Sequence, residues 1–320
     1  MRRSYFGLLC AVFLIGSLTC AQAGDLLVSS RETNSIKRYD GTTGVYKGDF
    51  VASGILTTPG DMVFGPDGNL YVSNSGKASV ERFDGRTGAY LGTFVATNEY
   101  AAGQYLRFGP DGNLYVSSYW TNSIGKFNGT TGAFMSVFAT VDRPMGLAFA
   151  PNGDLYVASN STNYIKRFNG STGSFVADLS SPWMPPTNSP AGMEFYPIAP
   201  YNSYLCVVSS GNYAVKAWDT TNDAYLGNAI NDGVGGWGWR MDIAFNNAGQ
   251  AFVTTANSAA VLMYNGGEFA GNFITAGSGG LGTPGGIVFM PDAVPEPSSM
   301  LALGTSLIGL SAFVSRRRKS

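Results

Sequence analysis

Between residues 24 and 292 the apolar and polar residues follow one pattern that recurs six times. The second copy shows it most clearly, because Asp61–Phe64, Asn69–Ser73, Ser79–Phe83 and Tyr90–Val95 are short apolar or alternating segments. Segments of this length and composition, bounded by Gly, Pro, Asp and Asn, predict β-strands. Each copy of the pattern therefore predicts four short strands.

Two stretches between these strands carry turn chemistry. Residues 65–68 read Gly-Pro-Asp-Gly and residues 84–88 read Asp-Gly-Arg-Thr-Gly. Glycine suits the positive φ of a tight hairpin, and Asp or Asn suits its first position. A calcium loop would need an Asp-x-Asp-x-Asp-Gly run followed by Glu, which the chain lacks. We interpret both stretches as turns.

The spacing of the copies predicts a β-propeller. The segment Gly-Asn-Leu-Tyr-Val at 68–72 recurs at 112–116 and, with Asp, at 153–157; weaker copies begin at Gly24, Ser203 and Gly249, giving spacings of 44, 44, 41, 50 and 46 residues. Four strands per unit of this length is typical of a propeller blade.

The two ends of the repeat region complement each other. The first copy lacks an opening strand, whereas residues 284–292 supply only an opening strand. Pairing the last strand with the first copy would close an all-β, six-bladed ring of four-stranded blades and remove its exposed edges. A solenoid would leave two incomplete blades unpaired, so we favour the closed ring.

The repeat resembles the NHL family of six-bladed propellers over residues 24–292. The resemblance is carried by Pro-x-Gly-apolar-x-Phe, by Asp-Gly-Asn-Leu-Tyr-Val, and by third strands such as residues 165–168, Ile-Lys-Arg-Phe. The acidic residue that NHL repeats place after Tyr-Val-Ala is Ser or Asn here. A WD40 propeller is disfavoured because no Gly-His…Trp-Asp pair recurs.

The C-terminal segment has three parts with separate physical properties. Pro295, Glu296 and Pro297 lie in residues 293–299, which cannot join a helix or sheet. Residues 300–315 form an apolar stretch whose length is close to that of the shortest transmembrane helices. Arg316, Arg317 and Arg318 begin a basic tail, 316–320, that would stay on the cytoplasmic side of the membrane. This order resembles the PEP-CTERM sorting tail of Gram-negative bacteria.

The PEP-CTERM resemblance implies a temporary anchor in the inner membrane that an exosortase-type enzyme recognises and removes. A permanent membrane anchor is the alternative, but it leaves Pro-Glu-Pro unexplained. Residues 1–23 form a signal peptide with cleavage expected before Gly24. A lipoprotein signal through Cys20 is the weaker alternative, since Thr19 suits it poorly. We expect an exported protein of the cell surface or extracellular matrix.

Charge and residue types exclude several kinds of function. Six of the 20 basic residues lie in the end segments, so the exported part has 14 basic and 21 acidic residues and a net charge of −7, with Glu296 included. This negative charge disfavours a nucleic-acid partner. No histidine is present, which removes Ser-His-Asp and Cys-His catalysis and every His-ligated metal site. Cys206 remains alone and is expected to be a buried thiol.

Four of the five tryptophans fall in loops that share one face of a propeller. The candidate ligand-binding residues are Tyr119, Trp120, Trp183, Trp237 and Trp239, with Tyr100, Tyr164 and Tyr213 on the same face. Exposed rings among Asn, Ser and Thr suit a saccharide or peptide. Equally, the rings could plug the axial channel or pack the longer loops. Trp218 is expected within a blade.

Two aspartates are weak candidates for a metal site. Asp61 and Asp242 replace the glycine that opens other inner strands, for example Gly146, and Tyr105 is a third replacement. A Ca²⁺-dependent lactonase of the SMP-30 type resembles this fold and holds its metal there. The Glu and Asn that the lactonase also uses have no match, so we expect no cofactor, with water-solvated aspartates in the channel.

The sequence therefore favours a non-enzymatic, exported propeller that binds a saccharide, such as an exopolysaccharide, or a surface protein. The first alternative is a metal-dependent lactonase or hydrolase that uses Asp61 and Asp242. The second is a purely structural surface protein.

Overall fold

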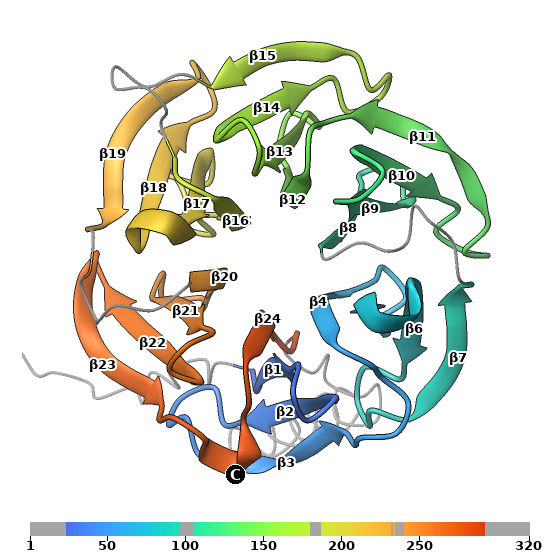
Figure 1. The fold of residues 1–320 in the computed structure, drawn as a ribbon. Coiled ribbons are helices and arrows are strands. Elements are labelled where there is room, and N and C mark those ends of the chain that lie inside the picture. The colour runs from blue at the N-terminus through green and yellow to red at the C-terminus, as the bar shows by residue number, and fades with distance from the viewer. Residues whose placement is uncertain (1–23, 97–104, 180–186, 232, 234–239, 292–320) are drawn as a thin grey trace, which may run out of the picture.

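The computed structural model describes residues 24–96, 105–179, 187–231, 233 and 240–291. Over these residues the chain forms six four-stranded antiparallel sheets that surround one axis as the blades of a propeller (Figure 1). The predicted six-bladed fold is confirmed.

Each blade runs from an inner strand at the axis to an outer strand at the rim. In that order the blades are: blade 1, β24 (Pro284–Phe289), β1 (Leu26–Ser30), β2 (Ser35–Tyr39) and β3 (Tyr46–Val51); blade 2, β4 (Pro59–Phe64), β5 (Leu70–Asn74), β6 (Ser79–Phe83) and β7 (Tyr90–Val95); blade 3, β8 (Leu106–Phe108), β9 (Leu114–Ser118), β10 (Ser123–Phe127) and β11 (Phe134–Thr140); blade 4, β12 (Pro144–Phe149), β13 (Leu155–Ser159), β14 (Tyr164–Phe168) and β15 (Phe175–Leu179); blade 5, β16 (Pro190–Phe195), β17 (Tyr204–Ser209), β18 (Ala214–Asp219) and β19 (Ala224–Ile230); blade 6, β20 (Arg240–Phe245), β21 (Ala251–Thr255), β22 (Ala260–Asn265) and β23 (Glu268–Ile274).

The C-terminal strand closes the ring as predicted. β24 pairs antiparallel with β1, with Leu26 opposite Phe289 and Val28 opposite Ile287. Beyond the strands, the Met290 amide donates to the Asp25 carbonyl at 2.7 Å. Blade 1 is therefore built from both ends of the repeat region, and the sheets close without an open blade.

Aromatic rings pack one blade against the next. Tyr71 of β5 is buried, with its ring centroid 4.8 Å from that of Phe94 in the same blade and 4.9 Å from that of Phe108 in blade 3. In blade 5 the corresponding residue is Cys206, which is also buried. Burial raises the pKa of its thiol to about 12, so the thiol is protonated and acts as a small apolar side chain, as predicted.

The Asp-Gly stretches are hairpin turns, as expected from their sequence. Asp84 Oδ1 accepts hydrogen bonds from the amides of Arg86 and Thr87, at 3.0 and 2.8 Å, and from the Thr87 hydroxyl. Gly88 has a φ of +75°, and a Cβ at this residue would lie 1.9 Å from the Phe50 carbonyl oxygen of the neighbouring blade. The turn therefore requires glycine for both conformation and space.

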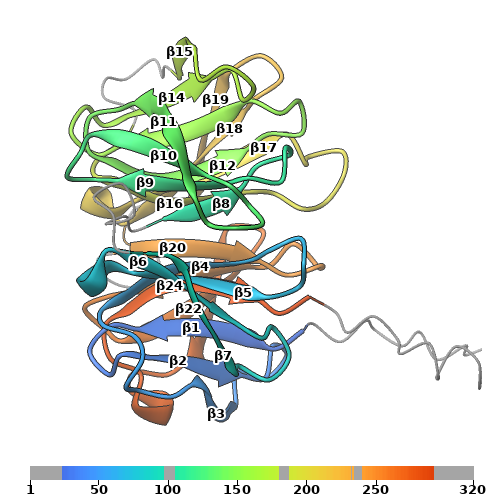
Figure 2. The same ribbon diagram turned by 90° about the vertical axis from the view of Figure 1, so that its right-hand side faces the viewer.

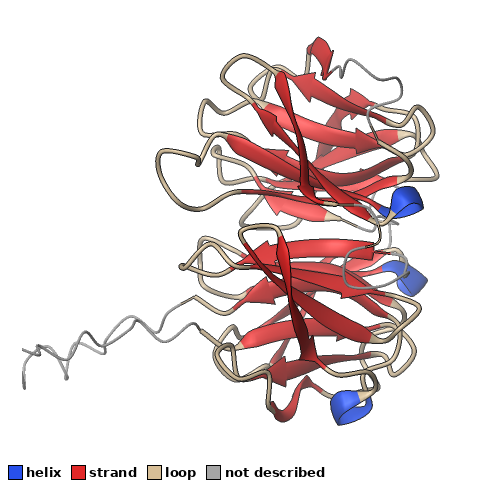
Figure 3. Ribbon diagram, turned by 90° about the vertical axis from the view of Figure 1, so that its left-hand side faces the viewer, coloured by secondary structure: helices blue, strands red, loops and turns tan. Residues whose placement is uncertain are grey.

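The propeller has two different faces. The loop face carries the loops between second and third strands and those between blades, and it holds the 3₁₀ helices η1 (Ser75–Lys77), η3 (Ser210–Asn212) and η4 (Ser278–Gly280) (Figure 3). The opposite, terminal face is where β1 begins and β24 ends (Figure 2).

The predicted signal peptide, sorting segment, apolar segment and basic tail all lie outside the described residues. Within residues 24–291 as described, no helix is long and apolar enough to cross a bilayer.

Candidate functional site

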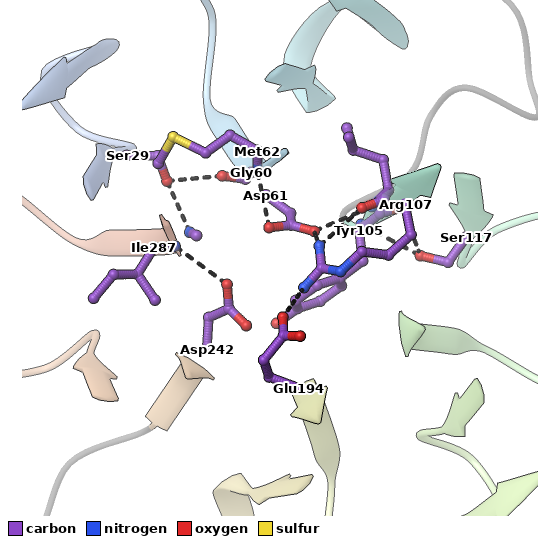
Figure 4. Close-up of polar contacts among 12 residues, drawn as sticks. Ser29, Gly60, Asp61, Met62, Tyr105, Arg107, Ser117, Glu194, Asp242 and Ile287 are labelled. Carbon is purple, nitrogen blue, oxygen red and sulfur yellow. Dashed lines mark hydrogen bonds and ion pairs between the residues drawn. The ribbon is translucent and has the colours of Figure 1, made fainter. Parts of the chain in front are cut away.

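A network of charged side chains lies at the axis, where the inner strands converge (Figure 4). Asp61 of β4 is 2% exposed, and its Oδ2 lies 2.6 Å from the Arg107 guanidinium of β8. The same guanidinium reaches Glu194 Oε2 of β16 at 3.4 Å. Arg107 therefore links three blades, and its positive charge offsets part of the cost of burying Asp61.

Tyr105 crosses the axis. It lies directly before β8 in blade 3, is 4% exposed, and donates its hydroxyl hydrogen to the Met241 carbonyl at 2.7 Å. Met241 belongs to β20 of blade 6, which lies opposite blade 3 in the ring. A buried tyrosine that spans opposite blades fills the axis at this level.

Asp242 of β20 is the most isolated charge in the network. It is fully buried, and its Oδ2 accepts the Ile287 amide at 3.2 Å, whereas Oδ1 has no hydrogen-bond partner within the described part of the chain. A Cβ added to Gly192 of blade 5 would lie 2.0 Å from this Oδ1. The glycine of one blade therefore leaves the space that the aspartate of the next blade occupies.

The surroundings shift these carboxyl groups toward the protonated form. Burial and the nearby Asp61 charge raise the pKa of Asp242 well above its usual range, against the opposing effect of Arg107. Burial also raises the pKa of Asp61, again against the effect of Arg107. The sequence predicts aspartates that are solvated by water in the channel. This prediction is wrong, because both side chains are buried among the inner strands.

In the structure, both carboxylate oxygen atoms of Asp61, one of the two candidate metal ligands, accept hydrogen bonds from protein groups. Asp61 Oδ2 is bound by the Arg107 guanidinium, and its Oδ1 accepts the Met62 amide at 2.8 Å. The described residues include no group of three or more His, Cys, Asp or Glu side chains placed to hold a metal ion. Calcium in proteins takes six to eight oxygen ligands.

A cavity of about 310 Å³ lies next to the axial network of charged side chains, on its terminal-face side. Arg107 and Glu194 contribute its charged groups, and Phe195, Phe245 and Phe289 at the ends of three inner strands contribute aromatic rings. One sequence signal marks Arg107 and Glu194. They lie two residues after the axial position, which is Tyr105 in blade 3 and Gly192 in blade 5, where the other inner strands carry Val or Ala.

On the loop face, the structure brings two of the five predicted ligand-binding residues together. Trp120 is 77% exposed, and its ring lies 5.0 Å from that of Tyr119 at an angle of 79°. Arg143, from the loop between β11 and β12, lies over the Tyr119 ring at 5.5 Å. Because Trp120 is so exposed, it does not plug the channel. No local sequence motif marks Arg143 as part of this cluster.

The other predicted aromatic residues are placed differently. Trp183, Trp237, Trp239 and Tyr100 lie outside the described residues. Tyr164 and Tyr213 are partly buried at the start of β14 and after η3. Trp218 is fully buried within blade 5, as predicted.

Comparison with known proteins supports both the fold and the tail. Residues 293–319 match the PEP-CTERM protein-sorting motif. No curated protein has a similar sequence. A chain in the crystal structure of a nidogen/laminin complex has 14% identity and a TM-score of 0.66, covering 84% of this chain and 99% of that chain.

Two bacterial structures are also similar. A protein of unknown function from Bacteroides caccae has 14% identity and a TM-score of 0.62, covering 83% of this chain and 98% of its own. Virginiamycin B lyase from Staphylococcus aureus has 14% identity and a TM-score of 0.59, covering 85% of this chain and 90% of its own. At these identities the likeness shows the fold alone. The chain is thus a six-bladed β-propeller ending in a PEP-CTERM sorting motif, which supports exosortase-type processing, export through the membrane and an extracellular or cell-surface location in a Gram-negative bacterium.

Proposed function

We propose that this protein is a non-enzymatic binding module of the cell surface or extracellular matrix, and that its loop face binds a saccharide. The observation that carries the proposal is Trp120, a large ring that is 77% exposed beside Tyr119. Flat aromatic surfaces bind the apolar faces of sugar rings, and surrounding polar groups hydrogen-bond the hydroxyls.

The position of the chain ends supports this choice of face. The last described residue, Pro291, follows β24 on the terminal face, and only residues 292–294 separate it from Pro295 of the sorting motif. Three residues span at most about 11 Å when fully extended. While the tail is in the membrane, this short connection would keep the terminal face toward the bilayer and the loop face, with Trp120, away from it.

The proposal is tested by affinity electrophoresis of the full chain in gels containing extracellular polysaccharide purified from the producing bacterium. We expect Trp120→Ala to weaken retention by about fivefold, because loss of a stacked ring costs about 1 kcal/mol of binding. The melting temperature should change little, since the ring is exposed.

Leu91→Ala is the matched control, because Leu91 is an exposed apolar residue on outer strand β7, away from the loop face. It should leave retention unchanged. Equal retention of Trp120→Ala and the parent protein would contradict the proposal. Binding to matrix protein but not to polysaccharide would identify a protein ligand instead.

A further inference from the structure

Arg143 is held beside Tyr119 by a backbone arrangement that recurs around the ring. The Arg143 amide donates to Asn122 Oδ1 at 2.9 Å, which joins the second-to-third loop of blade 3 to the start of blade 4. The same contact joins blades 1 and 2 and blades 4 and 5, through the pairs Asn34–Thr58 at 2.7 Å and Asn163–Ser189 at 2.9 Å.

The backbone conformation at this position is shared by three blades and belongs to the fold, but the fold does not require an arginine side chain there. Thr58, Arg143 and Ser189 all have positive φ values, 51°, 45° and 49°, and each precedes the proline that opens an inner strand. A small hydroxyl side chain satisfies this position in two of the three blades. Only blade 4 places a long cation there, so the fold does not account for Arg143.

The Arg143 guanidinium is available to a ligand. Its side chain is exposed and lies over the Tyr119 ring, whose electrons attract a cation. Among the described residues, Arg143 forms no ion pair, whereas Arg38, Arg107 and Arg167 each lie within 2.8 Å of a carboxylate. On the loop face, the exposed Trp120 indole and the Arg143 guanidinium, which has no ion-pair partner among the described residues, therefore both lie against the Tyr119 ring.

We propose that Trp120, Tyr119 and Arg143 form a binding site for an acidic saccharide. The apolar face of a sugar ring would pack on Trp120, and its carboxylate or sulfate would accept hydrogen bonds from Arg143, whose planar fork matches such groups. This inference rests on the proposed function and adds the chemical class of the ligand.

Negative charges elsewhere on the protein repel an acidic ligand, so binding of such a ligand would depend on Arg143. Asp142 is the exposed neighbour of Arg143, and the exported part of the chain has a net charge of −7. Attraction must then come from Arg143 locally. Binding should be weak, should decrease with added salt, and should depend on this one side chain.

The test measures retention of the full chain in gels containing polygalacturonate, dextran sulfate or neutral dextran. We expect one of the two acidic polymers to retain the protein more than dextran does. Arg143→Gln should weaken that retention by about fivefold, in line with about 1 kcal/mol for an exposed charge-assisted contact. Arg143→Lys should restore part of it, and Asp142→Asn should strengthen it.

Arg86→Gln is the matched control, because it removes the same charge from an exposed hairpin at the opposite end of a blade. Dextran retention equal to that of both acidic polymers would overturn the inference, as would an equal effect of Arg86→Gln and Arg143→Gln. If Trp120→Ala weakens retention on the bacterial polysaccharide but Arg143→Gln does not, the acidic ligand is wrong and the proposed function stands. If neither variant has an effect, both fail.

Discussion

At the scale of single residues, two of the six inner strands place a buried aspartate at the axis, where three others have a glycine. Gly146, Gly192 and Gly286 occupy the axial position in three blades without a side chain, whereas Asp61 and Asp242 occupy it in two others. The buried Asp61 is matched by Arg107, but Asp242 Oδ1 has no hydrogen-bond partner among the described residues. Asp242 should therefore reduce stability whenever it is ionised.

This imbalance predicts a pH dependence of stability. Folding raises the pKa of Asp242, so the folded state binds its proton more tightly than the unfolded state does. The contribution of Asp242 to stability is then fully present below the ordinary aspartate pKa of about 4 and is lost as pH rises toward the folded-state pKa. Asp242→Asn should raise the melting temperature at pH 8 and change it little at pH 4.

Asp84→Asn is the matching control on the surface. Hydrogen bonds from Thr87 and Arg86 hold the pKa of Asp84 below its usual value, so its stabilising effect is lost in acid instead. Because the pKa of Asp84 lies below the ordinary aspartate value of about 4, Asp84→Asn should change the melting temperature by nearly the same amount at pH 4 and pH 8, whereas the effect of Asp242→Asn should grow with pH; thermal melts over this range distinguish the two. A stability difference between Asp242→Asn and the parent that is the same at every pH would show that Asp242 does not titrate in this range.

The residues of the site differ in how well the sequence predicts them. Asp61, Tyr105 and Asp242 stand out because each interrupts a repeated glycine. The contact of Arg143 with Tyr119 could not be predicted, because it joins loops of two blades whose separation depends on ring closure. The sequence predicts the face on which Trp120 lies, because the loop between the second and third strands lies on the same face in every blade.

At the scale of strands, local patterning and glycine turns predict most of the fold. In blade 2 the predicted third and fourth strands match β6 and β7, and the first two differ from β4 and β5 by one or two residues. Closure by β24 was predicted from the missing strand of the first copy. The tryptophan-containing loops were placed only by position, since irregular loops carry no periodic signal.

Removing the closing strand should destabilise the whole propeller. β24 supplies the buried Ile287 to the core, and the Gly286 amide donates to Ser29 Oγ at 2.9 Å. A chain that ends at Gly282 should melt well below a chain that ends at Pro291, because blade 1 loses its inner strand and exposes the β1 edge. Differential scanning calorimetry compares the two. Equal melting temperatures would contradict closure through β24.

At the scale of the whole molecule, the ends of the described chain and the proposed binding residues lie on opposite faces of the propeller. The terminal face carries both ends of the described chain, and the loop face carries Trp120 and Arg143. A temporary anchor next to the terminal face would leave the proposed binding face accessible both before and after processing. The sequence predicts both the propeller and the sorting motif, but the structure was needed to show that the two ends of the described chain lie opposite Trp120.

The sorting motif predicts removal of the C-terminal segment in the native host. Surface-exposed protein should lack residues 300–320, and replacing Pro295, Glu296 and Pro297 with alanine should leave an uncleaved, membrane-held form. Mass spectrometry of the surface fraction measures this. Detection of intact Arg316–Ser320 on surface-exposed parent protein would indicate a permanent anchor.

Hydroxyl-radical footprinting read by mass spectrometry can show whether a saccharide binds at Trp120 on the loop face. Polysaccharide from the producing bacterium should reduce oxidation of Trp120 and Tyr119, while Phe175, which is 56% exposed on outer strand β15, keeps its reactivity and the buried Trp218 stays unreactive throughout. Equal oxidation of Trp120 with and without the polysaccharide would show that the saccharide does not bind at this face.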